Sequence, residues 1–182
     1  ALGVAWERAA RGLEALKGVP GRLETVANPE GVHVLVDYAH TDSALELILR
    51  QINVLPHRRI LTVFGCGGDR DRTKRGPMGR AAVRWSDLAI VTSDNPRSED
   101  PRRIIGDVVA GIKAAGAGNY KVIADRREAI AQAITLARPG DTVVIAGKGH
   151  ETYQILGDKT IHFDDREVAR EALDARKPAV WI

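Results

Sequence analysis

The stretch Ile60-Leu-Thr-Val-Phe-Gly-Cys-Gly-Gly-Asp69 combines an apolar run with a glycine-rich polar loop, which makes it the strongest single indicator of the fold. Short apolar runs rich in β-branched residues are typical of strands buried on both faces of a parallel sheet. Ile60–Phe64 is such a run, and four more occur along the chain. We therefore predict five strands, at Ile60–Phe64 and at Val32–Val36, Leu88–Val91, Lys121–Ala124 and Val143–Ala146.

Helical patterns separate these runs. Ser43–Leu55 opens with Ser43-x-x-Glu46, which predicts a capping box. Pro101–Ala115 begins with proline and has its apolar residues on one face, and Arg127–Ala137 supplies another helix. Strands that alternate with helices of this length predict right-handed βαβ units. The expected fold class is α/β, with a doubly wound, mostly parallel, Rossmann-like sheet.

The last part of the chain has a different pattern. Tyr153–Leu156 and Thr160–Phe163 flank Gly157-Asp158, which predicts a C-terminal hairpin at the edge of the sheet. A final helix is expected from Asp164.

The first part of the chain reads as a helix. Ala1–Lys17 places apolar residues on one helical face, and Gly18–Gly21 ends the pattern. A domain seldom begins within an amphipathic helix. We therefore interpret residues 1–20 as the terminal helix and linker of a preceding domain, and residues 21–182 as a separate domain.

The composition is that of one globular domain. The chain has 182 residues, of which 44% are hydrophobic and 28% charged. The net charge of +3 could suggest nucleic acid, but the aromatic content of 4% leaves few stacking partners for bases. Cys66 is the only cysteine, which excludes an intramolecular disulfide. With no long apolar run, we expect a cytoplasmic protein that binds neither membrane nor nucleic acid.

Polar residues follow four of the five predicted strands. They form the segments Asp37–His40, Gly65–Asp71, Asp94–Arg97 and Gly147–Glu151. In an open parallel sheet, the loops beyond the carboxyl ends of the strands share one rim, where such folds bind ligands. We therefore expect these four loops to converge.

Several readings of these loops remain open. Gly65–Gly68 could cradle a phosphate or form a tight turn, and it lacks the spacing of a Walker loop. The basic residues Arg72, Lys74 and Arg75 are read as a solvated face. His40 and His150 could be general bases, although loop histidines are more often structural or exposed. No catalytic triad and no metal motif is readable, so we predict neither catalytic nor metal-binding residues in this chain.

Three side chains suit an amino-acid zwitterion. Arg97 follows Pro96, which stiffens its loop, and a held guanidinium suits bidentate recognition of a carboxylate. Asp94 and Glu151 offer acceptors for an ammonium group. Alternatively, Asp94 caps its turn and Glu151 is an ordinary surface residue.

Four ordered strings carry a family resemblance: VDYAHT (36–41), FGCGGDRD (64–71), TSDNPR (92–97) and AGKGHE (146–151). Together they resemble the carboxy-terminal domain of the Mur ligases, from about Gly21 to the end of the chain. The resemblance implies amide-bond formation with ATP and Mg²⁺ in peptidoglycan synthesis. In that reaction a peptide carboxylate becomes an acyl phosphate, which the amine of the incoming amino acid attacks.

The resemblance also implies residue roles. The DNPR string is the family's motif for meso-diaminopimelate, and other contacts to this substrate match residues of the GGDRD and GKGHE strings. Diaminopimelate differs from lysine by a carboxylate at its far end, which Arg97 would meet. Lysine would leave a desolvated arginine without its partner. The implied substrate contacts are Arg70, Asp94, Asn95, Pro96, Arg97, Gly147 and Glu151.

For ATP, the resemblance implies a phosphate contact from Arg22, a ribose contact from Asp37 and a further contact from His40. The chain departs from the family pattern at Asp42, where the family has proline, and this should alter the start of the following helix.

Family members also have an amino-terminal domain for the UDP-sugar and a central domain with the phosphate loop and the magnesium ligands. We expect these domains and the UDP-MurNAc-dipeptide as partners, and we expect this chain alone to be inactive. The alternatives are a related ligase that adds another amino acid, such as lysine, and a non-catalytic small-anion-binding domain.

Overall fold

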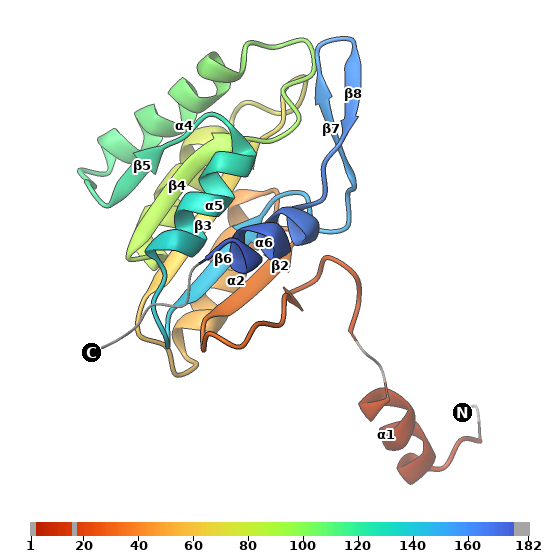
Figure 1. Cartoon of the computed structure of the whole chain (residues 1–182). Helices are drawn as coiled ribbons and strands as arrows, with labels where there is room; N and C mark the ends of the chain where they lie inside the picture. Colours follow the sequence, from red (N-terminus) through yellow and green to blue (C-terminus); the bar gives the residue numbers. More distant parts are fainter. Residues whose placement is uncertain (1–2, 16–17, 177–182) are drawn as a thin grey trace.

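The structure, a computed structural model, describes residues 3–15 and 18–176. A six-stranded sheet forms its centre (Figure 1). The strands are β1 (Glu24–Thr25), β2 (His33–Asp37), β3 (Ile60–Cys66), β4 (Leu88–Ser93), β5 (Tyr120–Val122) and β6 (Thr142–Ala146). Their order is β1-β2-β6-β3-β4-β5, and every neighbouring pair except β1-β2 is parallel.

Helices cover both faces of this sheet (Figure 1). Apolar residues of α2 (Asp42–Asn53), α3 (Arg75–Trp85) and α4 (Pro101–Ala114) form one core with β3, β4 and β6. Residues of α5 (Arg126–Leu136) and α6 (Asp165–Asp174) form a second core on the opposite face. The predicted doubly wound, mostly parallel α/β fold is confirmed.

The element boundaries differ from the prediction in small ways. β5 begins at Tyr120 and ends at Val122, so it starts one residue earlier and ends two residues earlier than the predicted run Lys121–Ala124. The two-residue strand β1 was not predicted, because so short a strand has no readable periodicity. It pairs antiparallel with β2 and forms one edge of the sheet.

The predicted capping box at Ser43 is wrong. Helix α2 begins at Asp42, which leaves Ser43 inside the first turn. The preceding residue, Thr41, has extended backbone angles, and its hydroxyl accepts a hydrogen bond from the Ala44 N–H at 3.2 Å. Thr41 is therefore the N-cap, the position at which a side-chain oxygen satisfies a free backbone N–H.

The C-terminal hairpin forms, but its predicted place at the sheet edge is wrong. β7 (Tyr153–Leu156) and β8 (Lys159–His162) make a separate two-stranded sheet. The chain leaves the main sheet from β6, which β2 and β3 already flank, so no free edge is near. The hairpin stands instead above the carboxyl ends of the strands (Figure 1). The final helix begins as predicted, with Asp164 as its N-cap.

The predicted N-terminal helix is confirmed as α1 (Trp6–Glu14), while residues 1–2, 16–17 and 177–182 lie outside the described residues. α1 has no buried residue and lies apart from the sheet (Figure 1). Its origin in a preceding domain stays a prediction. In the described part of the chain, no helix has the length and apolarity needed to cross a membrane.

Candidate functional site

The loops that follow β2, β3, β4 and β6 meet at one pocket of about 470 Å³. The register of the sheet brings them together, because Asp37 and Phe64 both pair with Ala146, and Cys66 pairs with Ser93. The predicted convergence of the four polar loops is confirmed. The pocket is lined by Tyr38, His40, Thr41, Gly67, Arg70, Asp71, Lys74, Asp94, Asn95, Arg97, Gly147, Glu151 and Tyr153.

The predicted site residues divide into two groups. Seven of them line the pocket: His40, Arg70, Asp94, Asn95, Arg97, Gly147 and Glu151. The other three do not. Pro96 is buried beside them, Arg22 lines a separate hollow with residues 18–25, and Asp37 is buried beneath the rim.

The hairpin holds the loop after β4 in place. Gln154 donates a side-chain hydrogen bond to the Asp94 carbonyl at 2.7 Å, and the Ile155 N–H donates to Asn95 Oδ1 at 3.0 Å. The backbone of Arg97 exchanges hydrogen bonds with Ile155 and Gly157. These contacts support Arg97 at φ 52°, a left-handed conformation that is unusual for a residue with a side chain.

The guanidinium of Arg97 reaches across to the glycine-rich loop after β3. Its Nη1 donates to the Gly68 carbonyl at 2.9 Å, and the Gly68 N–H donates to the Asn95 carbonyl at 2.9 Å. A Cβ on Gly68 would collide with the Pro96 carbonyl. At Gly68, glycine therefore permits close packing of two loops, which favours the tight-turn reading over a phosphate cradle.

Three buried or partly buried polar groups form a cluster at the base of the pocket. Asn95 Nδ2 donates to Glu151 Oε2 at 2.9 Å. The Lys148 ammonium lies 3.3 Å from the same Glu151 oxygen and 3.4 Å from Asn95 Oδ1, and it also donates to the Tyr153 carbonyl. Lys148 is fully buried, whereas the Glu151 side chain is 17% exposed. Glu151 is therefore more than an ordinary surface residue.

Asp94 lies against the glycine that begins the loop after β6. Its Oδ1 accepts from the Asn95 N–H at 2.6 Å, so Asp94 caps its own turn. Its Oδ2 would lie 2.7 Å from a Cβ on Gly147, whose φ is 118°. Only glycine fits at this position, because a side chain would both strain the backbone and collide with the carboxylate.

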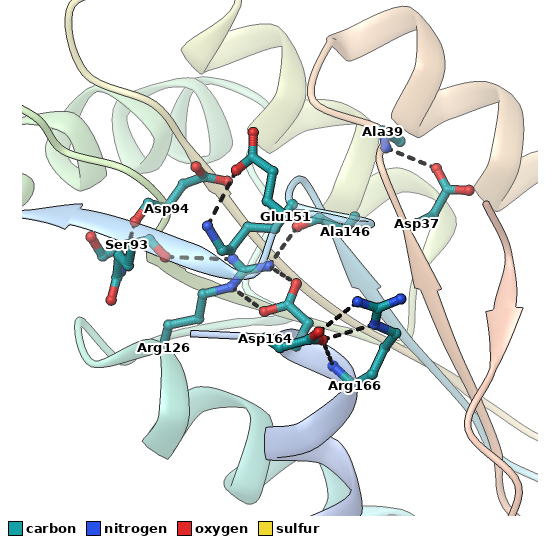
Figure 2. A network of polar contacts seen from close by, with 12 residues as sticks. Asp37, Ala39, Ser93, Asp94, Arg126, Ala146, Glu151, Asp164 and Arg166 are labelled. Atoms are coloured by element: carbon teal, nitrogen blue, oxygen red, sulfur yellow. Dashed lines mark hydrogen bonds and ion pairs between the residues drawn. The ribbon is translucent and has the colours of Figure 1, made fainter. Parts of the chain in front are cut away.

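A fully buried ion pair lies beneath this cluster (Figure 2). Arg126, at the start of α5, binds Asp165 of α6 through two hydrogen bonds, at 2.7 and 2.8 Å. The guanidinium also donates to the carbonyls of Ser93 and Ala146, which end β4 and β6. Burial alone would lower the pKa of Arg126, but the Asp165 carboxylate outweighs it and the pKa is raised. The pair fixes the bases of both loops.

The loop after β3 is supported by a second set of ion pairs. Glu99 accepts from the Asp69 N–H at 2.7 Å and from Arg75 at 2.8 Å, and Arg75 also binds Asp107 at 2.9 Å. Arg75 is 1% exposed, so its assignment to a solvated face was wrong, because two carboxylates compensate its buried charge. Arg72 is exposed as predicted.

The prediction of a solvated face fits Lys74 in part, because this residue is neither buried nor fully exposed. It lines the pocket, and its ammonium donates to the His40 carbonyl at 2.7 Å. The charge pattern by itself could not distinguish Lys74 from Arg72.

A group of rings adjoins the pocket on the β2 side. The Tyr38 ring lies 4.6 Å from that of His40 and 5.0 Å from that of His150, and the Arg22 guanidinium lies 4.9 Å above it. Both histidines are exposed, as expected of loop histidines. Asp37 accepts from the backbone N–H groups of Leu23 and Ala39, each at 2.8 Å (Figure 2 shows the bond to Ala39). Asp37 thereby holds the segment that carries Arg22.

The lone cysteine is not activated. Cys66 is buried at the end of β3, and burial raises the pKa of its thiol to about 12, which keeps it protonated at neutral pH. Among the described residues, no group of three or more histidine, cysteine, aspartate or glutamate side chains could hold a metal ion.

Sequence reasoning missed the supporting residues more than the lining ones. Lys148 lies within a quoted motif, but no pattern shows that its side chain turns inward. Arg126 and Asp165 lie on different helices, 39 positions apart in the sequence. Arg126 opens a helix whose next two residues, Arg127 and Glu128, are also charged, so no local pattern distinguishes it.

Comparison with known proteins agrees with this geometry. Residues 21–149 match the family model of the Mur ligase, glutamate ligase domain. Two UDP-N-acetylmuramoyl-L-alanyl-D-glutamate–2,6-diaminopimelate ligases are similar in sequence. That of Geobacillus thermodenitrificans is 55% identical over 92% of this chain and 34% of its own length. That of Gloeobacter violaceus is 54% identical over 97% of this chain and 36% of its own length.

Solved structures give the same result. A ligase structure of that same name superposes with a TM-score of 0.80 at 43% identity, over 95% of this chain and 35% of the other. A UDP-N-acetylmuramate–alanine ligase from Thermotoga maritima is 17% identical with a TM-score of 0.65, over 95% of this chain and 34% of its own, and shares the fold. The chain thus spans about a third of the length of the relatives it matches. From its four motifs, its sheet and the match over residues 21–149, the chain belongs to the Mur ligase family, in its glutamate ligase domain.

Proposed function

We propose that this chain is the amino-acid-binding domain of an ATP-dependent ligase that adds meso-diaminopimelate to UDP-MurNAc-L-Ala-D-Glu in peptidoglycan synthesis. The names of the relatives at 53–55% identity support this substrate. The chemistry proceeds through an acyl phosphate of the peptide, which the amine of the amino acid attacks. The phosphate loop and the Mg²⁺ ligands belong to the central domain of such a ligase.

The balance of charge in the pocket carries the proposal. Its lining has three cationic side chains, Arg70, Lys74 and Arg97, and three anionic ones, Asp71, Asp94 and Glu151. Diaminopimelate has two ammonium and two carboxylate groups at neutral pH, so it can use both signs. A site for small anions would not need the carboxylates, since each would repel the ligand. The zwitterionic amino acid therefore fits better than the non-catalytic anion-binding alternative.

The nucleotide is expected on the Tyr38 side of the pocket. Arg22 is exposed and its guanidinium can meet a phosphate oxygen, so this residue fits the role that the family implies. His40 lies beside the same ring. Asp37 is only 5% exposed and both of its oxygens already accept backbone N–H groups, so a ribose contact from Asp37 stays a prediction with little support.

The substrate is tested by replacing Arg97 in the complete ligase. Arg97→Ala should lower the preference for meso-diaminopimelate over L-lysine, measured as the ratio of kcat/KM values, by roughly 100-fold. This corresponds to the loss of about 3 kcal/mol for a charge-assisted contact to the distal carboxylate. Arg97→Lys, which keeps the charge and loses the bidentate fork, should fall in between. An unchanged preference in Arg97→Ala would refute the assignment.

A titration of this chain distinguishes the alternatives. NMR spectra of the backbone amides of Arg70, Asn95, Arg97 and Glu151 are recorded with meso-diaminopimelate and, separately, with L-lysine. Selective shifts with diaminopimelate are expected. Selective shifts with lysine would favour the related lysine-adding ligase, and shifts with inorganic phosphate alone would favour the anion-binding domain.

A further inference from the structure

The Lys148 ammonium is enclosed by protein and does not line the pocket. Its two glycine neighbours have left-handed backbone angles, with φ 118° at Gly147 and 52° at Gly149. A Cβ on Gly149 would lie 2.6 Å from that of Tyr38. The close packing of this turn on its neighbours therefore directs the Lys148 side chain inward.

Three acceptors surround the buried ammonium, which matches its three N–H donors. They are Glu151 Oε2 at 3.3 Å, Asn95 Oδ1 at 3.4 Å and the Tyr153 carbonyl. An ammonium that is desolvated in this way must keep its acceptors in place, because the loss of any one leaves a donor unsatisfied. The positions of Glu151 and Asn95 are therefore tied to Lys148.

These contacts determine how the Glu151 carboxylate is oriented at the pocket. Its Oε2 is shared by Lys148 and Asn95, and its Oε1 makes no hydrogen bond to any residue the structure describes. Asn95 is also fixed, because its Oδ1 faces Lys148 and the Ile155 N–H, while its Nδ2 faces Glu151. Because Glu151 belongs to the pocket lining, this second carboxylate oxygen is left available to accept from an ammonium ligand.

We infer that Lys148 is a positioning residue for the amino acid: it holds Glu151 and Asn95 so that one carboxylate oxygen of Glu151 faces an ammonium group of the substrate. This inference rests on the proposed function. Because Lys148 acts through Glu151, its removal should weaken binding of the amino acid and have a smaller effect on the chemical step.

A double-mutant cycle in the complete ligase tests this inference. Lys148→Met keeps most of the side-chain volume and removes the ammonium, and Glu151→Gln removes the carboxylate charge. Each single variant should raise KM for meso-diaminopimelate by about 10-fold, with kcat changed less than about 3-fold. In the double variant the two effects should not multiply, so KM should stay within about 2-fold of the larger single effect. Lys113→Met, which removes an exposed lysine of α4, is the matched control and should leave KM unchanged.

Multiplied effects, with KM raised about 100-fold in the double variant, would overturn the inference, and so would an unchanged KM in Lys148→Met. If Lys148→Met does not fold, the cycle is run with Lys148→Gln, which retains hydrogen-bonding capacity. Failure of both variants to fold would make Lys148 a purely structural residue and would also overturn it. A wild-type ligase that does not use diaminopimelate would defeat the proposed function itself, whereas a working enzyme with multiplied effects would defeat only this inference.

Discussion

The two sides of the pocket are built from similar ion pairs but differ in their exposure to water. We call the loops after β4 and β6 the inner wall (residues 94–97 and 147–151) and the loop after β3 the outer wall (residues 65–71). Beneath the inner wall, Arg126 and Asp165 are both 0% exposed. Beneath the outer wall, Arg75 is equally buried, but its partners Glu99 and Asp107 are 12% and 54% exposed.

This difference determines how firmly each wall is held. If one member of a buried ion pair moves away, the other is left as a desolvated charge. The inner wall therefore tolerates little rearrangement. Water can replace a partly exposed partner, so the outer wall can adjust at a smaller cost. The inner wall carries the predicted specificity residues Asn95, Arg97 and Glu151, while the outer wall contributes Arg70, whose side chain is exposed. The residues proposed to set specificity therefore lie mainly on the wall that is held more firmly.

The largest effect is expected from breaking the inner pair. Arg126→Met should lower the free energy of unfolding by about 3–5 kcal/mol, because Asp165 is left buried without its partner. Urea denaturation at pH 7 measures this change. The neighbouring Arg127, whose pair with Glu171 is exposed on both sides, provides the control, and Arg127→Met should change little. A loss below about 1 kcal/mol for Arg126→Met would show that the inner wall is not held by this pair.

A smaller effect is expected from the outer wall. Arg75→Met should cost about 2 kcal/mol, because Glu99 keeps its contacts to Arg72 and to the Asp69 N–H, and water solvates Asp107. The same urea experiment measures it. If Arg75→Met were as destabilising as Arg126→Met, the proposed contrast between the walls would be wrong.

The smallest effect concerns pH. The hydrogen bonds from Arg75 and from the Asp69 N–H hold the pKa of Glu99 below its ordinary value of 4.5. A carboxylate whose pKa is lowered by folding stabilises the protein at pH values above its ordinary pKa. This contribution is lost as the pH falls through the lowered pKa. Glu99→Gln should therefore lower the urea midpoint at pH 7, and the difference from wild type should shrink as the pH falls below 4.5.

The control for the pH experiment is Glu171→Gln, which removes a carboxylate whose ion pair is exposed. Its midpoint should follow that of the wild type at every pH. A difference between wild type and Glu99→Gln that grows as the pH falls would contradict the sign of the Glu99 contribution.

Patterns of neighbouring residues predicted an element correctly where those residues themselves determine its structure. The buried strands carry continuous apolar runs, and Asp164 caps α6 because a short acidic side chain satisfies the free N–H groups of a helix start. The prediction of a capping box at Ser43 failed because two residues only two positions apart, Thr41 and Ser43, can each cap a helix. The exact start of α2, which packing onto the sheet decides, selects Thr41.

Local periodicity was enough to predict the α/β class, five of the six strands of the main sheet and the convergence of the four polar loops, because parallel strands place their carboxyl ends together. The burial of particular charged residues became apparent only from the packed structure. Arg75, Arg126 and Lys148 are the same residue types as the exposed Arg72, Arg127 and Lys113. Arg72 and Arg127 also pair with carboxylates that are distant in sequence, so neither the residue type nor the presence of a partner distinguishes the buried group from the exposed one. Burial of a charge requires compensation at atomic distance, and a linear pattern does not contain that distance.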